Sequence, residues 1–215
     1  MTVASPRIPL DPFSLSVRPA RRLTQLLGGL ALYGASMALQ IRARLGLDPW
    51  DVLHEGLTKR MGLSFGTITA ITGVIVLLGW IPLRQRPGIG TVCNVFMIAM
   101  SVDAALWLLP MPSGLPLRAT FLVAGVVLNA LAAAAYIGTR LGPGPRDGLT
   151  TGIYARTGLS LRLIRTGIEI AVLLGGWLLG GTVGVGTVFY ALAIGPLTQA
   201  FLPYVVHKAP SPESS

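Results

Sequence analysis

The chain has 215 residues, of which 52% are hydrophobic and only 12% are charged, and its mean hydropathy is +0.68. A soluble domain has about 25% charged residues, so this composition excludes a soluble enzyme, a coiled coil and a disordered chain. The net charge of +9 indicates arginines beside anionic lipid rather than nucleic-acid binding. Cys93 is the single cysteine, which excludes an intrachain disulfide and a thiolate zinc site. We therefore expect an integral membrane protein.

Six hydrophobic stretches are long enough to cross a bilayer, for which about 20 residues suffice. They cover residues 23–41, 63–83, 89–111, 119–139, 163–182 and 183–206. The segments 1–22 and 207–215 have no apolar period, and we expect them to be tails. The sequence therefore predicts an all-α membrane protein with six transmembrane helices.

Basic residues between the spans predict the orientation of the chain, because cytoplasmic loops carry an excess of Lys and Arg. They gather in the first tail, around residues 84–86 and 140–165, and at Lys208. Both termini are therefore expected in the cytoplasm. The segment 42–60 is an exception, since it is expected outside although it contains four basic residues.

The second half of the sequence repeats the first at a constant offset of 96 residues, as between Gly46 and Gly142. Residues 45–53 (LGLDPWDVL) match 141–149 (LGPGPRDGL), and 88–91 (GIGT) match 184–187 (GVGT). Shared Pro, Asp and paired Gly in one register indicate an internal duplication. Since each copy holds three spans, the second must enter the bilayer from the opposite side. The sequence thus predicts two inverted repeats, 23–111 and 119–206, an architecture that recurs in transporters with a site near the midplane.

Each repeat contains a short motif that predicts a helix, over 49–61 and 145–157. Both begin with Pro, have an Asp in the first turn and an Arg near the end, and are followed by Gly and then by a Ser that can cap the next span. Such a helix is about 18 Å long and cannot cross a hydrocarbon core of about 30 Å. It either lies flat at the interface or enters the membrane as a re-entrant half-helix. A distorted full span is a third alternative.

Polar residues in the motifs and in the third span of each repeat are the candidate site residues. Asp51 and Asp147 either cap their helices or bind a solute or ion. Asp103 is an acid at membrane depth or a residue near the outer interface, and its repeat counterpart is Gln199. Arg146 replaces Trp50 of the first copy, which favours an anionic or zwitterionic solute. The residues expected to line or gate a solute path are therefore Trp50, Asp51, Asp103, Arg146, Asp147 and Gln199.

The remaining polar groups favour structural roles. Glu169 follows Arg165 by four residues, which indicates an ion pair along one helix. Asn129 is expected to join helices, and His54 is expected at the surface. The sequence has no Ser–His pairing, His–Glu zinc signature or Cys nucleophile, so we expect no enzyme, no catalytic residue, no metal and no cofactor.

The motifs in residues 45–51, 141–149 and 180–187 resemble those of the YczE/YyaS/YitT family of bacterial integral membrane proteins, and the likeness extends from about Leu26 to Leu202. The resemblance implies a multi-pass protein of the bacterial inner membrane and a small-molecule permease. We therefore expect a transporter for a small polar or anionic solute. The alternatives are a substrate-binding membrane subunit that needs a separate energising partner, and a regulatory membrane protein. Expected partners are membrane lipid, a small-molecule solute and, as one option, further copies of the chain.

Overall fold

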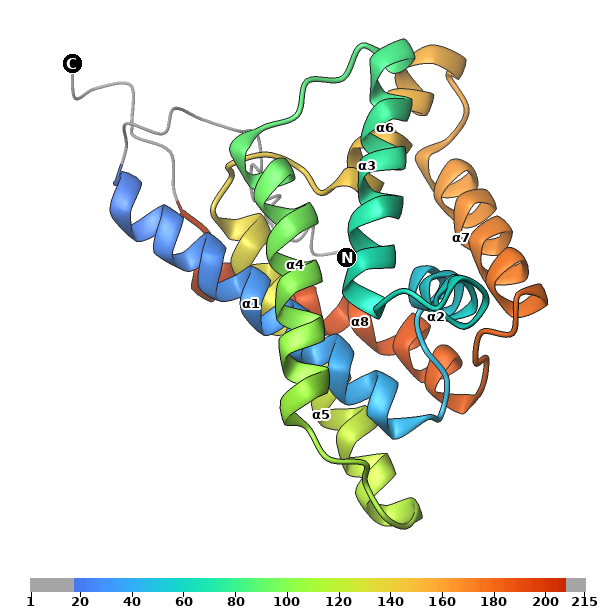
Figure 1. Cartoon of the computed structure of the whole chain (residues 1–215). Coiled ribbons are helices and arrows are strands. Elements are labelled where there is room, and N and C mark those ends of the chain that lie inside the picture. Colours follow the sequence, from blue (N-terminus) through green and yellow to red (C-terminus); the bar gives the residue numbers. More distant parts are fainter. Residues whose placement is uncertain (1–17, 208–215) are drawn as a thin grey trace, which may run out of the picture.

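A computed structural model describes residues 18–207, and this range contains helices and connecting loops but no strand (Figure 1). The predicted all-α fold is therefore confirmed. The helices are α1 (Pro19–Ala43), α2 (Pro49–Met61), α3 (Phe65–Leu83), α4 (Ile89–Leu108), α5 (Leu115–Gly138), α6 (Pro145–Thr157), α7 (Leu161–Leu178) and α8 (Val185–Val205). Helix α1 begins at Pro19, four residues before the predicted span. Most of the two predicted tails lies outside the described residues.

Four of the helices are long and apolar enough to cross a membrane, namely α3, α4, α5 and α8. The other two predicted spans correspond to α1 and α7, which contain more polar groups. Helix α1 has 25 residues but includes Gln25 and Gln40, whereas α7 has 18 residues and includes Arg165 and Glu169. Large hydrophobic side chains such as Leu178 of α7 and Leu192 of α8 lie exposed on the surface of the protein, as expected for helices that face lipid.

The two short helices begin and end where the motifs predict. Both α2 and α6 have 13 residues, and the backbone leaves each helix through a left-handed glycine, Gly62 or Gly158. Ser64 and Ser160 then cap α3 and α7. The cap of α2 is Asp48 rather than the first-turn acid, because its carboxylate accepts hydrogen bonds from two backbone N–H groups.

The backbone conformation recurs at the spacing of the sequence repeat. Within residues 18–207, ten residues have positive φ, and they form five pairs that lie 96 positions apart. The pairs are Arg18 with Gly114, Arg44 with Arg140, Gly46 with Gly142, Gly62 with Gly158, and Arg84 with Gly180. Arginine is an unusual residue in this conformation, so its presence at both 44 and 140 is not explained by local preference. The chain therefore turns in the same way at corresponding points of its two halves.

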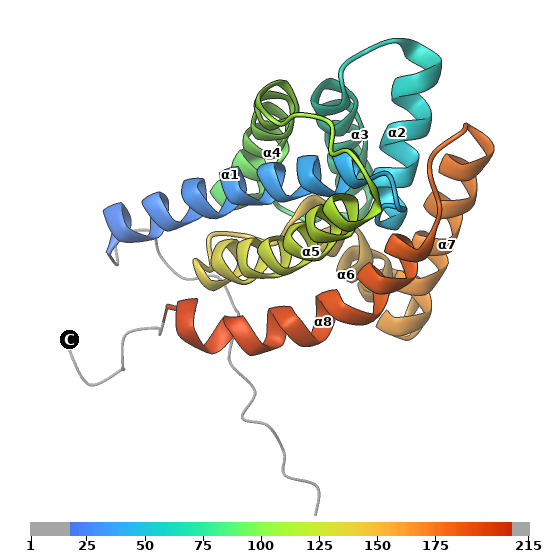
Figure 2. The ribbon, with the colours of Figure 1, turned by 90° about the horizontal axis from the view of Figure 1, so that it is seen from below.

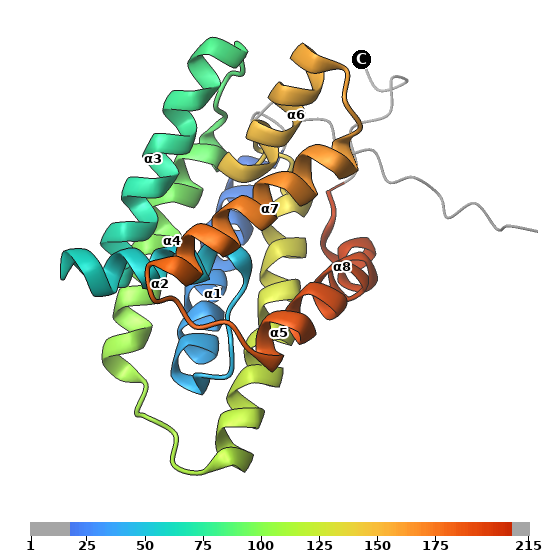
Figure 3. The same ribbon diagram turned by 90° about the vertical axis from the view of Figure 1, so that its right-hand side faces the viewer.

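The two halves are intertwined rather than placed end to end (Figures 2 and 3). Helix α1 packs along α5 and α4, and α5 packs along α8. Each short helix packs mainly on a long helix of the other half, α2 against α7 and α6 against α3. The turns that precede α4 and α8 also cross over, because the N–H of Gly90 donates to Leu141 and the N–H of Gly186 donates to Leu45.

One pair of equivalent contacts differs between the halves. Helices α3 and α4 pack side by side, whereas α7 and α8 diverge from the loop that joins them and hardly touch (Figures 1 and 3).

The amide of Asn129 on α5 joins three long helices, because it donates to Ser36 of α1 and accepts from Tyr190 of α8. Its predicted role in joining helices is confirmed.

Candidate functional site

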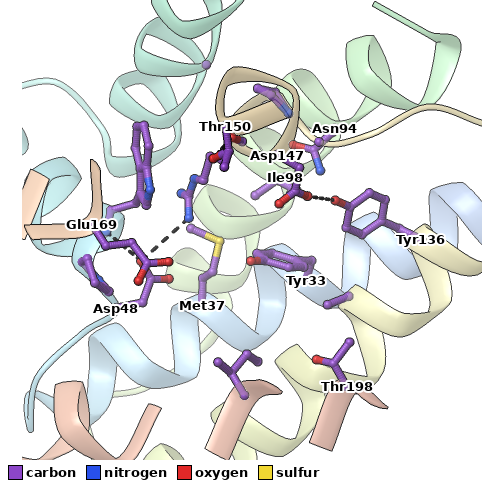
Figure 4. A pocket seen from close by; sticks show the side chains of 18 of the residues that line it. Tyr33, Met37, Asp48, Asn94, Ile98, Tyr136, Asp147, Thr150, Glu169 and Thr198 are labelled. Carbon is purple, nitrogen blue, oxygen red and sulfur yellow. Dashed lines mark hydrogen bonds and ion pairs between the residues drawn. The ribbon is translucent and has the colours of Figure 1, made fainter. Parts of the chain in front are cut away.

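A cavity of about 710 Å³ lies where the two short helices begin (Figure 4). The start of α2 contributes Asp48 and Trp50 to its wall, and the start of α6 contributes Gly144, Arg146 and Asp147. The long helices of both halves complete the wall. A helix N-terminus carries a partial positive charge, and two such ends lie at this one cavity in an otherwise apolar chain.

Arg146 connects the two helix ends. Its guanidinium lies 3.8 Å from the carboxylate of Asp48 and 3.9 Å from that of Asp51. The same guanidinium stacks on the ring of Trp50 at 4.8 Å from the ring centroid, a favourable arrangement for a cation. Two carboxylates therefore face one guanidinium, and the charge of Arg146 is already balanced inside the protein.

Behind this contact lies a buried polar network of Asp51, His54 and Thr72. A ring nitrogen of His54 lies 3.1 Å from the carboxylate of Asp51, and the other lies 2.8 Å from the hydroxyl of Thr72. His54 is only 1% exposed, so the expectation of a surface histidine was wrong. The short helix α2 places it three residues after Asp51, on the face that packs against α3.

Burial changes the acidity of the groups on α2, which is too short to span the membrane. It raises the pKa of the Asp48 and Asp51 carboxyls to about 6, against the lowering effect of Arg146. Burial, followed by the nearby charge of Arg146, lowers the pKa of His54 to about 3. His54 is therefore neutral near pH 7 and acts as a hydrogen-bonding group rather than as a cation.

Asp147 is exposed to the cavity and has a different environment. Figure 4 shows the hydroxyl of Tyr136 pointing toward its carboxylate, to which it donates at 3.3 Å. Within residues 18–207 Asp147 forms no ion pair. Further aromatic side chains, Tyr33 and Tyr190, line the same space.

The wall formed by α7 and α8 contains several polar side chains. Arg165 and Glu169 of α7 form an ion pair at 3.0 Å, as their spacing predicts. Gln199 and Thr198 of α8 lie on the same wall. The two helices that form this wall hardly touch each other.

Comparison with known proteins identifies the family. Residues 20–203 match the profile of DUF6198, described as a family of unknown function. The chain belongs to this family.

The chain is similar over most of its length to proteins of two bacteria. An uncharacterized protein of Haemophilus influenzae is 36% identical over 197 residues, which cover 92% of this chain and 90% of that protein. The uncharacterized membrane protein YczE of Bacillus subtilis is 32% identical over 186 residues, 85% of this chain and 86% of YczE. YyaS of the same organism is 28% identical over 183 residues, 82% of this chain and 90% of YyaS. The expected relationship to YczE and YyaS is thus confirmed, and no solved structure matches the chain.

The structure places most of the predicted site residues of this DUF6198 protein together. Trp50, Arg146, Asp147 and Gln199 line the cavity, and Asp51 lies directly behind Arg146. Asp103 does not line it. Its carboxylate instead accepts a hydrogen bond from the hydroxyl of Ser64 at 2.5 Å and from the N–H of Gly66 at 2.7 Å, and so ties α4 to the start of α3.

Several residues of the site were missed by sequence reasoning. Asp48 directly precedes the first proline of α2, and this position for an N-cap was a usable signal. The tyrosines at 33, 136 and 190 gave no such signal, because they lie on three helices that are far apart in the sequence. Within residues 18–207, no cluster of three or more His, Cys, Asp or Glu side chains is placed to hold a metal ion.

Proposed function

We propose that this protein is a membrane transporter for a small polar solute, which binds in the cavity between the N-termini of α2 and α6. The observation that carries the proposal is that both short helices begin at this one cavity. Discontinuous helices whose N-termini meet near the middle of the membrane are a recurring way to build a solute site in transporters. The cavity volume of about 710 Å³ is within the range that small-molecule sites occupy.

The proposed membrane arrangement has six spans, α1, α3, α4, α5, α7 and α8, in two inverted repeats. The five pairs of left-handed residues 96 positions apart support the duplication. The buried ends of α2 and α6 favour the re-entrant alternative over a helix that lies flat at the interface, because Asp48 is 3% exposed and Pro145 is also buried. Non-helical backbone inside the membrane is tolerated where protein surrounds it, and protein surrounds the segments that lead into α2 and α6.

The difference between α3–α4 and α7–α8 supports an alternating opening of the cavity. In the first half, Asp103 holds α3 against α4 and closes that side. In the second half, the equivalent Gln199 lines the cavity and α7 and α8 are apart. With the orientation inferred from the arginines, the open side faces the cytoplasm and the closed side faces outward. A solute would leave the site on the other side when α3 and α4 move apart and α7 and α8 come together.

The test begins with the purified chain in detergent and a thermal-shift screen of amines, amino acids, carboxylates and sugars. Solutes that stabilise the protein are then offered in radiolabelled form to liposomes containing the protein alone, with protein-free liposomes as the control. We expect saturable uptake. Arg146→Glu should abolish it while the variant still inserts into the membrane, because the reversed charge would face two carboxylates.

Two outcomes would contradict the proposal. Binding without uptake by the chain alone would favour a substrate-binding subunit that needs an energising partner. Absence of binding by any class of solute would remove the proposed role of the cavity.

A further inference from the structure

The charges around the cavity do not balance, and this imbalance bears on the solute of the proposed function. Within residues 18–207, the acids at the cavity are Asp48, Asp147 and Glu169, with Asp51 directly behind Arg146. The bases are Arg146 and Arg165, and His54 is neutral. Four carboxylates therefore face two guanidinium groups.

Both guanidinium groups already have partners. Arg165 pairs with Glu169 at 3.0 Å, and Arg146 lies within 4 Å of both Asp48 and Asp51. Within residues 18–207, the Asp147 carboxylate has no such ion pair, although Arg165 is close enough to interact with it electrostatically. An anionic solute would have to approach this carboxylate and displace an acid from Arg146, which Coulomb repulsion opposes.

The two equivalent aspartates of the repeats differ in what surrounds them. Asp51 is 1% exposed and is held by His54 and Arg146. Asp147, at the same position of α6, is exposed to the cavity and accepts one hydrogen bond, from Tyr136. The protein satisfies the first carboxylate internally, and it leaves the second one directed at the space where a solute would lie (Figure 4).

We propose that Asp147 is the residue that recognises the solute, and that it pairs with a positively charged amino or guanidino group. The solute is then a small organic cation or a zwitterion. The tyrosines at 33, 136 and 190 provide aromatic contacts for the body of such a molecule, since aromatic faces attract cations. This inference rests on the proposed function. Of the anionic or zwitterionic solute that Arg146 alone suggested, it keeps the zwitterion and replaces the anion by a cation.

The first experiment sorts the thermal-shift screen by charge. A series on one four-carbon chain, 1,4-diaminobutane, 4-aminobutanoate and butanedioate, is included beside larger amines, amino acids and carboxylates. We expect stabilisation by amine-containing compounds and none by compounds that carry only carboxylates. Stabilisation confined to carboxylates would overturn the inference and leave the proposed transporter intact. Stabilisation by no class would contradict the proposed function itself.

The second experiment uses two variants of one residue. Asp147→Asn removes the charge and keeps the size of the side chain, whereas Asp147→Glu keeps the charge. For an amine identified in the screen, Asp147→Asn should weaken binding roughly 10-fold or more, as expected for a hydrogen bond between charged groups. Asp147→Glu should retain most of the affinity. Equal affinity of both variants and the wild type would show that Asp147 does not bind the amine.

A merely structural role of Asp147 makes a different prediction. Asp147→Asn would then lower the unfolding temperature and weaken the binding of cationic and neutral solutes alike. The ratio of the affinity for a cationic solute to the affinity for a neutral solute therefore separates recognition from folding. A ratio unchanged by Asp147→Asn would overturn the inference even if the absolute affinity fell.

Discussion

Gly148 shows how closely a single residue of the second motif is packed. A Cβ atom at this position would overlap the ring of Trp80, whose indole N–H donates to the carbonyl of Pro145 at 3.0 Å. Trp80 is itself buried, with 1% of its surface exposed. The glycine thus lets α3 hold the first turn of α6, and with it Arg146 and Asp147, at the cavity.

We expect Gly148→Ala to destabilise the protein by about 1–3 kcal/mol, the usual cost of overpacking a filled core. The measurement is thermal unfolding in detergent, followed by size-exclusion chromatography. Gly167→Ala is a matched control, since nothing lies within 4 Å of its Cβ position in α7. A similar effect of both substitutions would contradict this reason for Gly148.

The raised pKa of Asp48 and Asp51 predicts that the affinity for an amine depends on pH. Because the pKa of both carboxyls is about 6, they are ionised at pH 7.5 and protonated at pH 5. His54, with a pKa of about 3, stays neutral over this range and does not compensate. Acidification therefore makes the cavity less negative, and the affinity for an amine should fall several-fold between pH 7.5 and pH 5 in a thermal-shift titration. A constant affinity would show that these two acids do not act on the solute.

At the scale of elements, the short helices could be predicted to the residue but their neighbours could not. Pro at the start and Gly after the end are local signals, and they determined 49–61 and 145–157. The packing of α2 on α7 and of α6 on α3 depends on residues that lie far apart in the sequence, such as Gly56, whose Cβ position lies against the carbonyl of Gly176. No local pattern reports such a contact.

Asp103 illustrates the same limit, and it supports a prediction about the closed side. We expect Asp103→Asn to loosen α3 from α4, because an amide replaces the charged acceptor of Ser64 and Gly66. In a Cys93→Ser background, a cysteine at Thr198 reports access to the cavity. An impermeant maleimide should label it only from the cytoplasmic side, and from both sides after Asp103→Asn.

A control variant distinguishes this effect from general loosening. Glu55→Gln replaces a carboxylate that accepts hydrogen bonds from the N–H and the hydroxyl of Thr182, in the loop between α7 and α8, and labelling should stay one-sided. Ser64→Ala should act like Asp103→Asn. One-sided labelling of both Ser64→Ala and Asp103→Asn would contradict a gating role for the contact between Asp103 and Ser64.

At the scale of the whole molecule, the proposed inverted repeat predicts where equivalent residues lie relative to the membrane. Met61 and Thr157 are 96 positions apart, both exposed, at the C-terminal ends of α2 and α6. Single cysteines at these positions in the Cys93→Ser background should react with an impermeant maleimide from opposite sides. Labelling of both from one side would refute the inverted arrangement.

The composition and the repeat were enough to predict an all-α membrane protein and the position of its candidate site. They could not predict which acid would be satisfied by the protein. Asp51 and Asp147 have the same place in their motifs, and what separates them is His54, whose counterpart is Thr150. The sequence shows that difference, but only the fold shows that His54 is turned inward to Asp51.

The contact between Trp50 and Arg146 has a consequence for how such a chain could arise. The two residues occupy the same position of the two repeats, and a residue that touches its own counterpart lies on the axis that relates the copies. Two separate identical chains could place only like pairs there, either two tryptophans or two mutually repelling arginines. Joining the copies in one polypeptide allows the unlike pair, in which the aromatic ring of one motif faces the cation of the other.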